Sequence, residues 1–157
     1  MLPSLYEPYG LSHLEAMRVG AVPIVHPVDG LKATTTDPGV TPLENSPAHL
    51  RPYGQTSIFM QPMDTSAYWK GLDERLKGGD KAPQHATVLD DAHKNLRTAL
   101  DRAVALKQDT PEQALRVSYN AIRYVEEQHS WEEISKRYVA PLDAAVAAAQ
   151  KRIDQGL

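Results

Sequence analysis

The chain contains no cysteine, and this single absence excludes several kinds of site. Without thiols there can be no disulfide, no thiolate nucleophile and no metal held by sulfur. The six histidines include no pair at the i,i+4 spacing that a helical zinc motif needs. We therefore expect no metal site.

Long apolar runs and an excess of charge are absent as well. No stretch approaches the ~18 apolar residues needed to span a bilayer, and the first residues lack the basic-then-apolar layout of a secretion signal. The net charge of -3, from 17 basic and 20 acidic residues, provides no general attraction to nucleic acid or anionic lipid. For 157 residues, 41% of them hydrophobic, we expect one globular cytoplasmic unit that binds neither nucleic acid nor membrane.

Residues 1–30 show the pattern strand, turn, helix, strand. Residues 1–5 are apolar, residues 11–19 have helical spacing, and residues 21–26 form a β-rich run bounded by Gly20 and Pro27. This order is half of an α/β unit. The predicted fold class is therefore α/β, with few parallel strands and a mainly helical second half.

Residues 31–57 are predicted to form a long loop. The segment has four prolines, three consecutive threonines and no periodicity. Loops of this length in compact domains are usually lids, binding loops or insertions, so we expect it to be partly mobile.

Residues 58–157 are predicted to contain a short strand near "TSIFMQP" and then helices. An amphipathic stretch at 68–76 ends at the glycine- and lysine-rich break "KGGDKAP". The next helix shows apolar residues at intervals of three and four, which predicts one buried stripe. That stripe comprises Leu89, Ala92, Leu96, Leu100, Ala103 and Val104.

Two capping patterns mark the start of the last helices. Thr110 is placed as an N-cap, with Pro111 at the first helical position and Gln113 spaced to complete a capping box. Ser130 and Glu133 repeat the pattern in "SWEEISKRY". These caps predict two successive helices after residue 110.

Two further residues qualify this helical region. We expect Trp131, at the second helix start, to anchor the helix in the core rather than to stack on a sugar. Pro141 lacks a backbone donor and collides with the preceding turn, so it predicts a kink or a new helix start.

The stretch "LYEPYGLSHLEAM" has the features of a ligand-binding turn. A helix that begins near Gly10 presents unpaired N–H groups and the positive end of its dipole to the preceding loop, which suits a phosphate. Pro8 stiffens the approach of Glu7, and Glu15 lies about one turn along the helix. The two carboxylates could bind sugar hydroxyls on either side of a diphosphate. Alternatively, acidic residues here simply stabilise the helix.

The motif "PSLYEPYGLSHLEAMRVGAVPIVHPVDGL" resembles the nucleotide-sugar-binding signature of glycogen and starch synthases. More broadly, it resembles retaining glycosyltransferases with two facing Rossmann-like domains, the GT-B architecture. The segment "NLRTALDRAVALKQDTPEQALRVSYNAIRYVEEQHSWEEISKRY" is similar to the last helices of that family. Residues 34–55 and the linker near Gly78 lie outside the resemblance, and Asp29 stands where the family more often has a glycine.

The resemblance implies a donor-binding set at the turn and the helix start: Glu7, Tyr9, Gly10, Leu11, Ser12 and Glu15. Glu7 is expected to contact the donor sugar. Gly10 and Leu11 would place backbone amides near the sugar or diphosphate, and Ser12 a hydroxyl near the phosphates. Glu15 matches the carboxylate that holds the ribose in many related transferases, and the tyrosine of the turn shapes the pocket.

The implied function is that of the C-terminal portion of a donor domain. Such an enzyme transfers glucose from ADP-glucose or UDP-glucose to an α-1,4-glucan with retention, and it needs no metal cofactor. The family's Arg and Lys for the diphosphate, and its acceptor domain, lie upstream of the turn and are absent from this sequence. We therefore expect the chain to be inactive alone, in the cytoplasm or, in a photosynthetic eukaryote, the plastid.

Two alternatives remain open at this point. The chain could be a non-catalytic module that binds a nucleotide or a glucan. It could also be a subunit that assembles with an upstream polypeptide or with another copy of itself, because an uncovered sheet edge and exposed apolar surface favour pairing.

Overall fold

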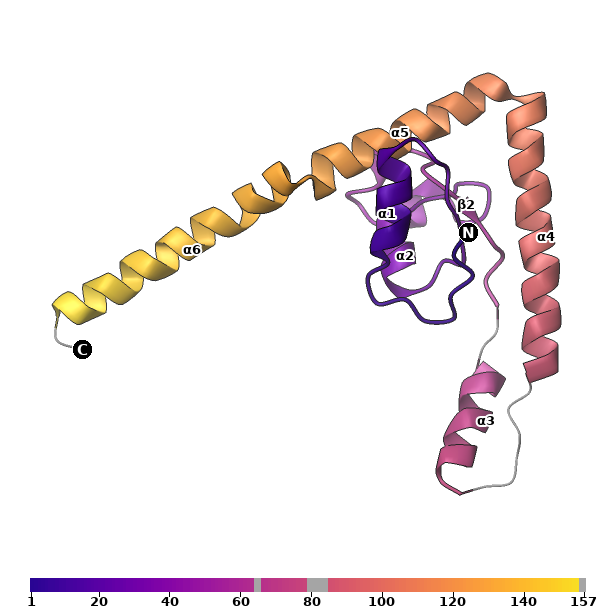
Figure 1. Ribbon diagram of the computed structural model, residues 1–157, viewed down its shortest axis with the longest axis horizontal. Coiled ribbons are helices and arrows are strands. Elements are labelled where there is room, and N and C mark those ends of the chain that lie inside the picture. Colours follow the sequence, from indigo (N-terminus) through magenta and orange to yellow (C-terminus); the bar gives the residue numbers. More distant parts are fainter. Residues whose placement is uncertain (64–65, 79–84, 156–157) are drawn as a thin grey trace.

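The computed structural model describes residues 1–63, 66–78 and 85–155, and it consists of a small body from which long helices extend (Figure 1). The elements in chain order are α1 (Leu11–Arg18), β1 (Ile24–Val25), α2 (Asp29–Thr34), η1 (Leu43–Asn45), η2 (Arg51–Tyr53), β2 (Ile58–Phe59), α3 (Ser66–Leu76), α4 (His85–Asp109), α5 (Pro111–His129) and α6 (Trp131–Asp154). The chain is thus mainly helical. No helix in the part of the chain that the structure describes is long and apolar enough to cross a membrane.

A two-stranded parallel sheet forms the centre of the body. Strand β1 pairs with β2 in a register that places Ile24 opposite Ile58 and Val25 opposite Phe59. The predicted strand at residues 1–5 is reduced to one parallel bridge between Leu2 and Val25. Parallel pairing of strands joined by a helical crossover is compatible with a partial α/β domain.

Helices pack on both faces of the sheet. Adjacent residues of a strand point to opposite faces, so each strand contributes to both contacts. Ile24 and Ile58 pack with Ala99 of α4, whereas Val25 and Phe59 pack with Leu31 of α2, as expected from the register. A separate cluster joins α1 to α5 and η2; it comprises Leu14, Met17, Leu50, Tyr53, Ala121, Tyr124 and Val125. Leu14 and Met17 of α1 therefore pack against α5, and the opposite side of α1 is exposed.

The predicted loop without regular structure at 31–57 requires correction. Helix α2 occupies its beginning, and the short 3-10 helices η1 and η2 follow. Thr35, Thr36 and Asp37 are all buried. The polar composition misled the prediction because these side chains are satisfied internally: Thr36 N–H donates to Thr56 Oγ1 at 3.0 Å, and Thr56 N–H donates to Thr36 O at 3.0 Å.

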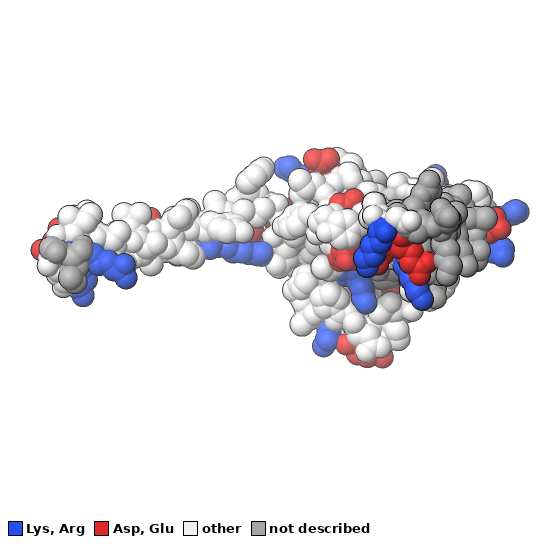
Figure 2. Space-filling model, turned by 90° about the horizontal axis from the view of Figure 1, so that it is seen from below, with Lys and Arg blue, Asp and Glu red and all other residues white. Residues whose placement is uncertain are grey.

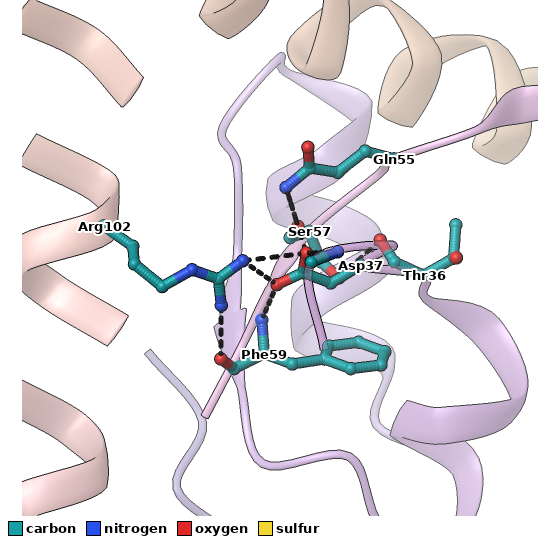
Figure 3. A network of polar contacts seen from close by, with 7 residues as sticks. Thr36, Asp37, Gln55, Ser57, Phe59 and Arg102 are labelled. Atoms are coloured by element: carbon teal, nitrogen blue, oxygen red, sulfur yellow. Dashed lines mark hydrogen bonds and ion pairs between the residues drawn. The ribbon is translucent and has the colours of Figure 1, made fainter. Parts of the chain in front are cut away.

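A polar network around Asp37 ties this segment to α4 and β2 (Figure 3). Asp37 is fully buried, and its Oδ2 accepts hydrogen bonds from Arg102 Nη2 at 2.8 Å and from Phe59 N–H at 2.7 Å. Its Oδ1 accepts from Gly39 N–H at 3.0 Å. Arg102 also donates to Phe59 O at 3.1 Å. One buried carboxylate thus fixes the helix, the strand and the loop together.

The predicted stripe on α4 is only partly correct. Leu96 and Ala103 pack against the sheet cluster, and so does Leu106, but Leu100 and Val104 are exposed. The side chain of Leu89 and residues 79–84 lie outside the described residues. The helical prediction for 68–76 is confirmed by α3.

Both predicted N-cap positions are confirmed, but only one of them has a side-chain cap. Ser130 is the N-cap of α6, and its Oγ accepts a hydrogen bond from Glu133 N–H at 3.2 Å. Thr110 also occupies the N-cap position of α5, with Pro111 following, but its hydroxyl donates to Leu106 O at 3.2 Å. The predicted capping box at Thr110 is therefore wrong, because the hydroxyl is used by the preceding helix.

Helix α6 projects from the body and buries none of its side chains (Figures 1 and 2). Trp131 is 82% exposed, so its predicted role as a core anchor is wrong. The helix is continuous through Pro141, and no new helix begins there. Tyr138, Leu142 and Val146 are also exposed, which gives α6 an uncovered apolar side.

Candidate functional site

The turn before α1 is closed by Glu7. Gly10 is the N-cap of α1 in the left-handed conformation, with φ 65° and ψ 64°, which favours glycine. Its N–H donates to Glu7 Oε1 at 3.0 Å. Within the described part of the chain, Glu7 Oε2 has no hydrogen-bond donor, so one carboxylate oxygen holds the turn and the other is available.

The start of α2 lies directly against this turn. Gly30 N–H donates to Glu7 O at 2.9 Å, and a Cβ atom at Gly30 would lie 2.6 Å from Pro8 O. Asp29 adopts a φ of 39° and its Oδ2 accepts from Glu7 N–H at 3.4 Å. The turn and the start of α2 therefore form one surface, and only a residue without a side chain fits at Gly30.

His13 joins the two helices beneath that surface. Its ring is fully buried, and Nε2 lies 2.7 Å from Thr34 Oγ1. The Thr34 hydroxyl donates to Gly30 O at 2.6 Å, so it accepts from Nε2–H. The remaining ring nitrogen, Nδ1, is buried and unpartnered among the residues that the structure describes. We expected His13 to be a surface or a packing histidine, and the structure shows that it is a packing histidine.

Burial sets the charge state of this ring. Loss of hydration lowers the pKa of His13 from 6.5 to about 4, although the Gly10 backbone favours the protonated form. The ring is therefore neutral at pH 7, with its proton on Nε2. It supports the turn as a neutral hydrogen-bond donor rather than as a cation facing a phosphate.

The remaining sequence-predicted residues lie on the open side of the turn and of α1. Tyr9, Leu11, Ser12 and Glu15 are exposed, whereas Gly10 is buried. No side chain caps the first turn of α1, so its leading N–H groups keep their capacity to bind an anion. The structure brings Glu7 and Gly10 together by a hydrogen bond and gathers the other three helix residues on one side.

A hollow of about 710 Å³ adjoins the turn, and its lining includes Tyr6, Asp29, Lys32 and Trp69. A second hollow, about 680 Å³, lies at the start of α5 and includes Gln55 in its lining. No group of three or more His, Asp or Glu side chains that could hold a metal ion occurs among the residues with a described position.

Comparison with curated proteins gives one consistent result. The similarity is to glycogen synthases. The chain is 59% identical over 34 residues to the glycogen synthase of Streptococcus equi subsp. equi (strain 4047), a stretch that covers 22% of this chain and 7% of that protein. It is 33% identical over 89 residues to the glycogen synthase of Streptococcus pneumoniae (strain Hungary19A-6), which covers 51% of this chain and 18% of that protein.

The chain therefore spans less than a fifth of the length of these glycogen synthases. No protein-family model matches it. No solved structure matches it either. The similarity supports a glycogen-synthase-like relationship over part of the chain.

Sequence reasoning missed the contribution of the start of α2. Asp29 was noted only as a departure from the glycogen synthase pattern, and Gly30 was given no role, yet Gly30 is the close contact of the turn. A glycine a few residues after the predicted strand at 21–26 was the available signal. No sequence pattern indicated the contact between His13 and Thr34, because it joins two helices that are distant in the sequence.

Proposed function

We propose that this chain is the C-terminal portion of the donor-binding domain of a glycogen- or starch-synthase-like glucosyltransferase. The complete enzyme would transfer glucose from ADP-glucose or UDP-glucose to an α-1,4-glucan with retention of configuration. The observation that carries this proposal is the Glu7–Gly10 turn at the uncapped start of α1, in a chain similar to glycogen synthases.

Each proposed contact follows from the chemistry of the turn. Glu7 Oε2 would accept a hydrogen bond from a hydroxyl of the donor sugar, while Oε1 keeps the turn closed. The first N–H groups of α1 and the Ser12 hydroxyl would bind the diphosphate, and Glu15 the ribose. Tyr9 would form the outer wall. Stabilisation of the departing diphosphate by oriented dipoles is the catalytic contribution of such a site.

Catalysis would need groups from a further polypeptide segment. The family's diphosphate-binding Arg and Lys and its acceptor domain lie upstream of the motif. In this proposal, the chain alone binds the donor weakly, and transfer of glucose requires an acceptor domain with those two residues.

Binding of the donor can be tested on the chain itself. ADP-glucose and UDP-glucose are titrated while amide shifts of residues 7–15 are followed by NMR. We expect saturable shifts at millimolar donor, and roughly tenfold weaker binding for Glu15→Ala. Glu126→Ala, an exposed glutamate on α5, serves as the control and should bind as the wild type does. Absence of saturable binding at millimolar concentrations of both donors would overturn the proposal.

A second candidate function is assembly with another polypeptide. It is favoured by the uncovered apolar side of α6, which includes Tyr138, Leu142 and Val146. A subunit of this kind would bind its partner through that helix whether or not it binds a nucleotide. Light scattering over a wide concentration range tests self-association, and co-purification with a glycogen synthase acceptor domain tests the other form.

A further inference from the structure

Helix α6 carries one apolar stripe along its length. None of its side chains is buried, and the helix stands clear of the body in both views (Figures 1 and 2). The stripe consists of large, exposed apolar side chains: Trp131, Tyr138, Leu142, Val146 and Ile153. Steps of four and seven residues return to the same side of an α-helix, so these side chains lie together over about 33 Å. Contiguous exposed apolar surface of this extent marks an interaction site.

The stripe is symmetric about Leu142. Tyr138 and Val146 lie four residues to either side of it. Trp131 and Ile153 lie eleven residues to either side. In an antiparallel pair of α6 helices that meet at Leu142, Tyr138 lies opposite Val146 of the other copy. Trp131 likewise lies opposite Ile153, so the surface is complementary to itself, as a two-fold interface between identical chains requires.

Side-chain size favours the antiparallel arrangement. The first half of the stripe carries two large rings, Trp131 and Tyr138, whereas the second half is aliphatic and has Ala145 and Ala149 on the same side. An antiparallel pair packs the bulky half of each copy against the small half of the other, so the two helices can stay close along their length. A parallel pair in register would oppose ring to ring at one end and alanine to alanine at the other.

Charge favours the same orientation. Glu132 and Glu133 lie at the base of the helix and share Lys136, whose Nζ is 3.0 and 2.7 Å from their carboxylates. Lys151 and Arg152 lie near the tip and have no ion-pair partner within the described part of the chain. Both pairs are nine and ten residues from the centre of the stripe, so antiparallel helices bring the basic pair level with the acidic pair of the other copy. A parallel pair would align like charges instead.

We propose that α6 is a dimerisation helix that pairs antiparallel with α6 of a second copy of this chain, with Leu142 at the two-fold axis. In such a pair, a helix that buries no side chain in its own body gains tertiary packing from the other copy. The pairing gives the second candidate function its partner and its contact. It does not depend on whether the donor site binds a nucleotide sugar.

The first test is the oligomeric state of the full chain. Sedimentation equilibrium over a wide concentration range should show a monomer–dimer equilibrium, and amide exchange along α6 should slow as the protein concentration rises. Leu142→Lys brings two ammonium groups together on the axis and should weaken the dimer by roughly a hundredfold. Ala144→Lys adds the same charge at an exposed position on the opposite side of the helix, so this matched control should dimerise as the wild type does.

The second test reads the orientation, which single cysteines can report because the chain has none of its own. A disulfide needs Cα atoms within ~7 Å of each other. Leu142→Cys meets itself on the axis and should give a disulfide-linked dimer under mild oxidation. Tyr138→Cys alone should not, because its two copies would be separated by about 12 Å along the pair. A mixture of Tyr138→Cys and Val146→Cys chains should form the mixed disulfide.

The outcomes separate this inference from the proposed function. A chain that stays monomeric at every concentration overturns the pairing, even where donor binding at residues 7–15 is found. A dimer that Leu142→Lys leaves unchanged forms elsewhere and also overturns it, and disulfide dimers of Tyr138→Cys alone would overturn the antiparallel register. Co-purification of a monomeric chain with an acceptor domain would assign α6 to a different partner. A dimer that is lost in Leu142→Lys supports the pairing, even where no donor binds and the glucosyltransferase proposal fails.

Discussion

Nε2 of His13 lies 2.7 Å from Oγ1 of Thr34, and this buried contact joins α1 to α2 beneath the candidate donor site. The chain of hydrogen bonds continues from Thr34 to Gly30 O, and Gly30 N–H in turn donates to Glu7 O. The shape of the turn therefore depends on a histidine that is hidden from any ligand.

The first prediction concerns pH. Because the pKa of His13 is lowered from 6.5 to about 4, the unfolded chain binds a proton between these values that the folded chain does not. The free energy of unfolding should fall as the pH falls from about 6.5 to about 4, by about 3 kcal/mol from this group. Urea unfolding at pH 7, 5.5 and 4 should give a smaller loss for His13→Gln than for the wild type. Equal losses would contradict the burial argument.

The second prediction concerns the contact between the turn and the start of α2. Gly30→Ala places a Cβ atom 2.6 Å from Pro8 O and 2.7 Å from Tyr9 Cα, and backbone atoms cannot move aside cheaply. We expect a loss of about 2 kcal/mol in unfolding free energy, together with shifted amide signals for residues 7–12. Ala33→Ser, an exposed change on the same helix, is the control. Wild-type stability in Gly30→Ala would show that the turn and α2 are not in close contact.

The third prediction concerns the Asp37 network. Arg102→Met leaves the buried Asp37 carboxylate without its cation, so we expect a loss of about 3 kcal/mol in urea unfolding. Arg97→Met removes an exposed arginine from the same helix and should change stability by less than about 0.5 kcal/mol. Similar values for the two variants would mean that the ion pair contributes no more than a surface arginine.

The fourth prediction concerns alkaline conditions. Burial raises the pKa of Tyr124 above its usual value of 10.0, and its hydroxyl lies 2.8 Å from His129 Nε2. A raised pKa means that the unfolded chain loses this proton first, so stability should fall as the pH rises above about 10. Tyr124→Phe should reduce that fall, whereas Tyr119→Phe, an exposed change on α5, should not. The measurement is thermal unfolding between pH 8 and 11.

The helices and the turn could be predicted because their signals are local. Gly10 and Leu11 mark a helix start, and α1 begins there. Ser130 marks another, and its hydroxyl caps α6. The parallel strands were recognised from short apolar runs next to Gly20 and near Ile58. Each of these patterns depends only on residues that are close together in the sequence.

The failed predictions depended on contacts between distant residues. Residues 34–37 are polar, and composition alone indicates a solvated loop, but Asp37 is buried because Arg102 lies opposite it. Trp131 is apolar and was expected in the core, yet its side chain is exposed. Burial of a side chain is decided by what packs against it, which periodicity does not encode.

The lack of buried side chains on α6 has a consequence for local unfolding of this helix. Since none of its side chains is buried, its helical state depends on its alanine-rich sequence and its Ser130 cap rather than on the core. Its amide hydrogens should exchange with solvent through local opening, long before those of Val117 to Val125 on α5 do so. We therefore expect α6 to open without unfolding of the core around α5.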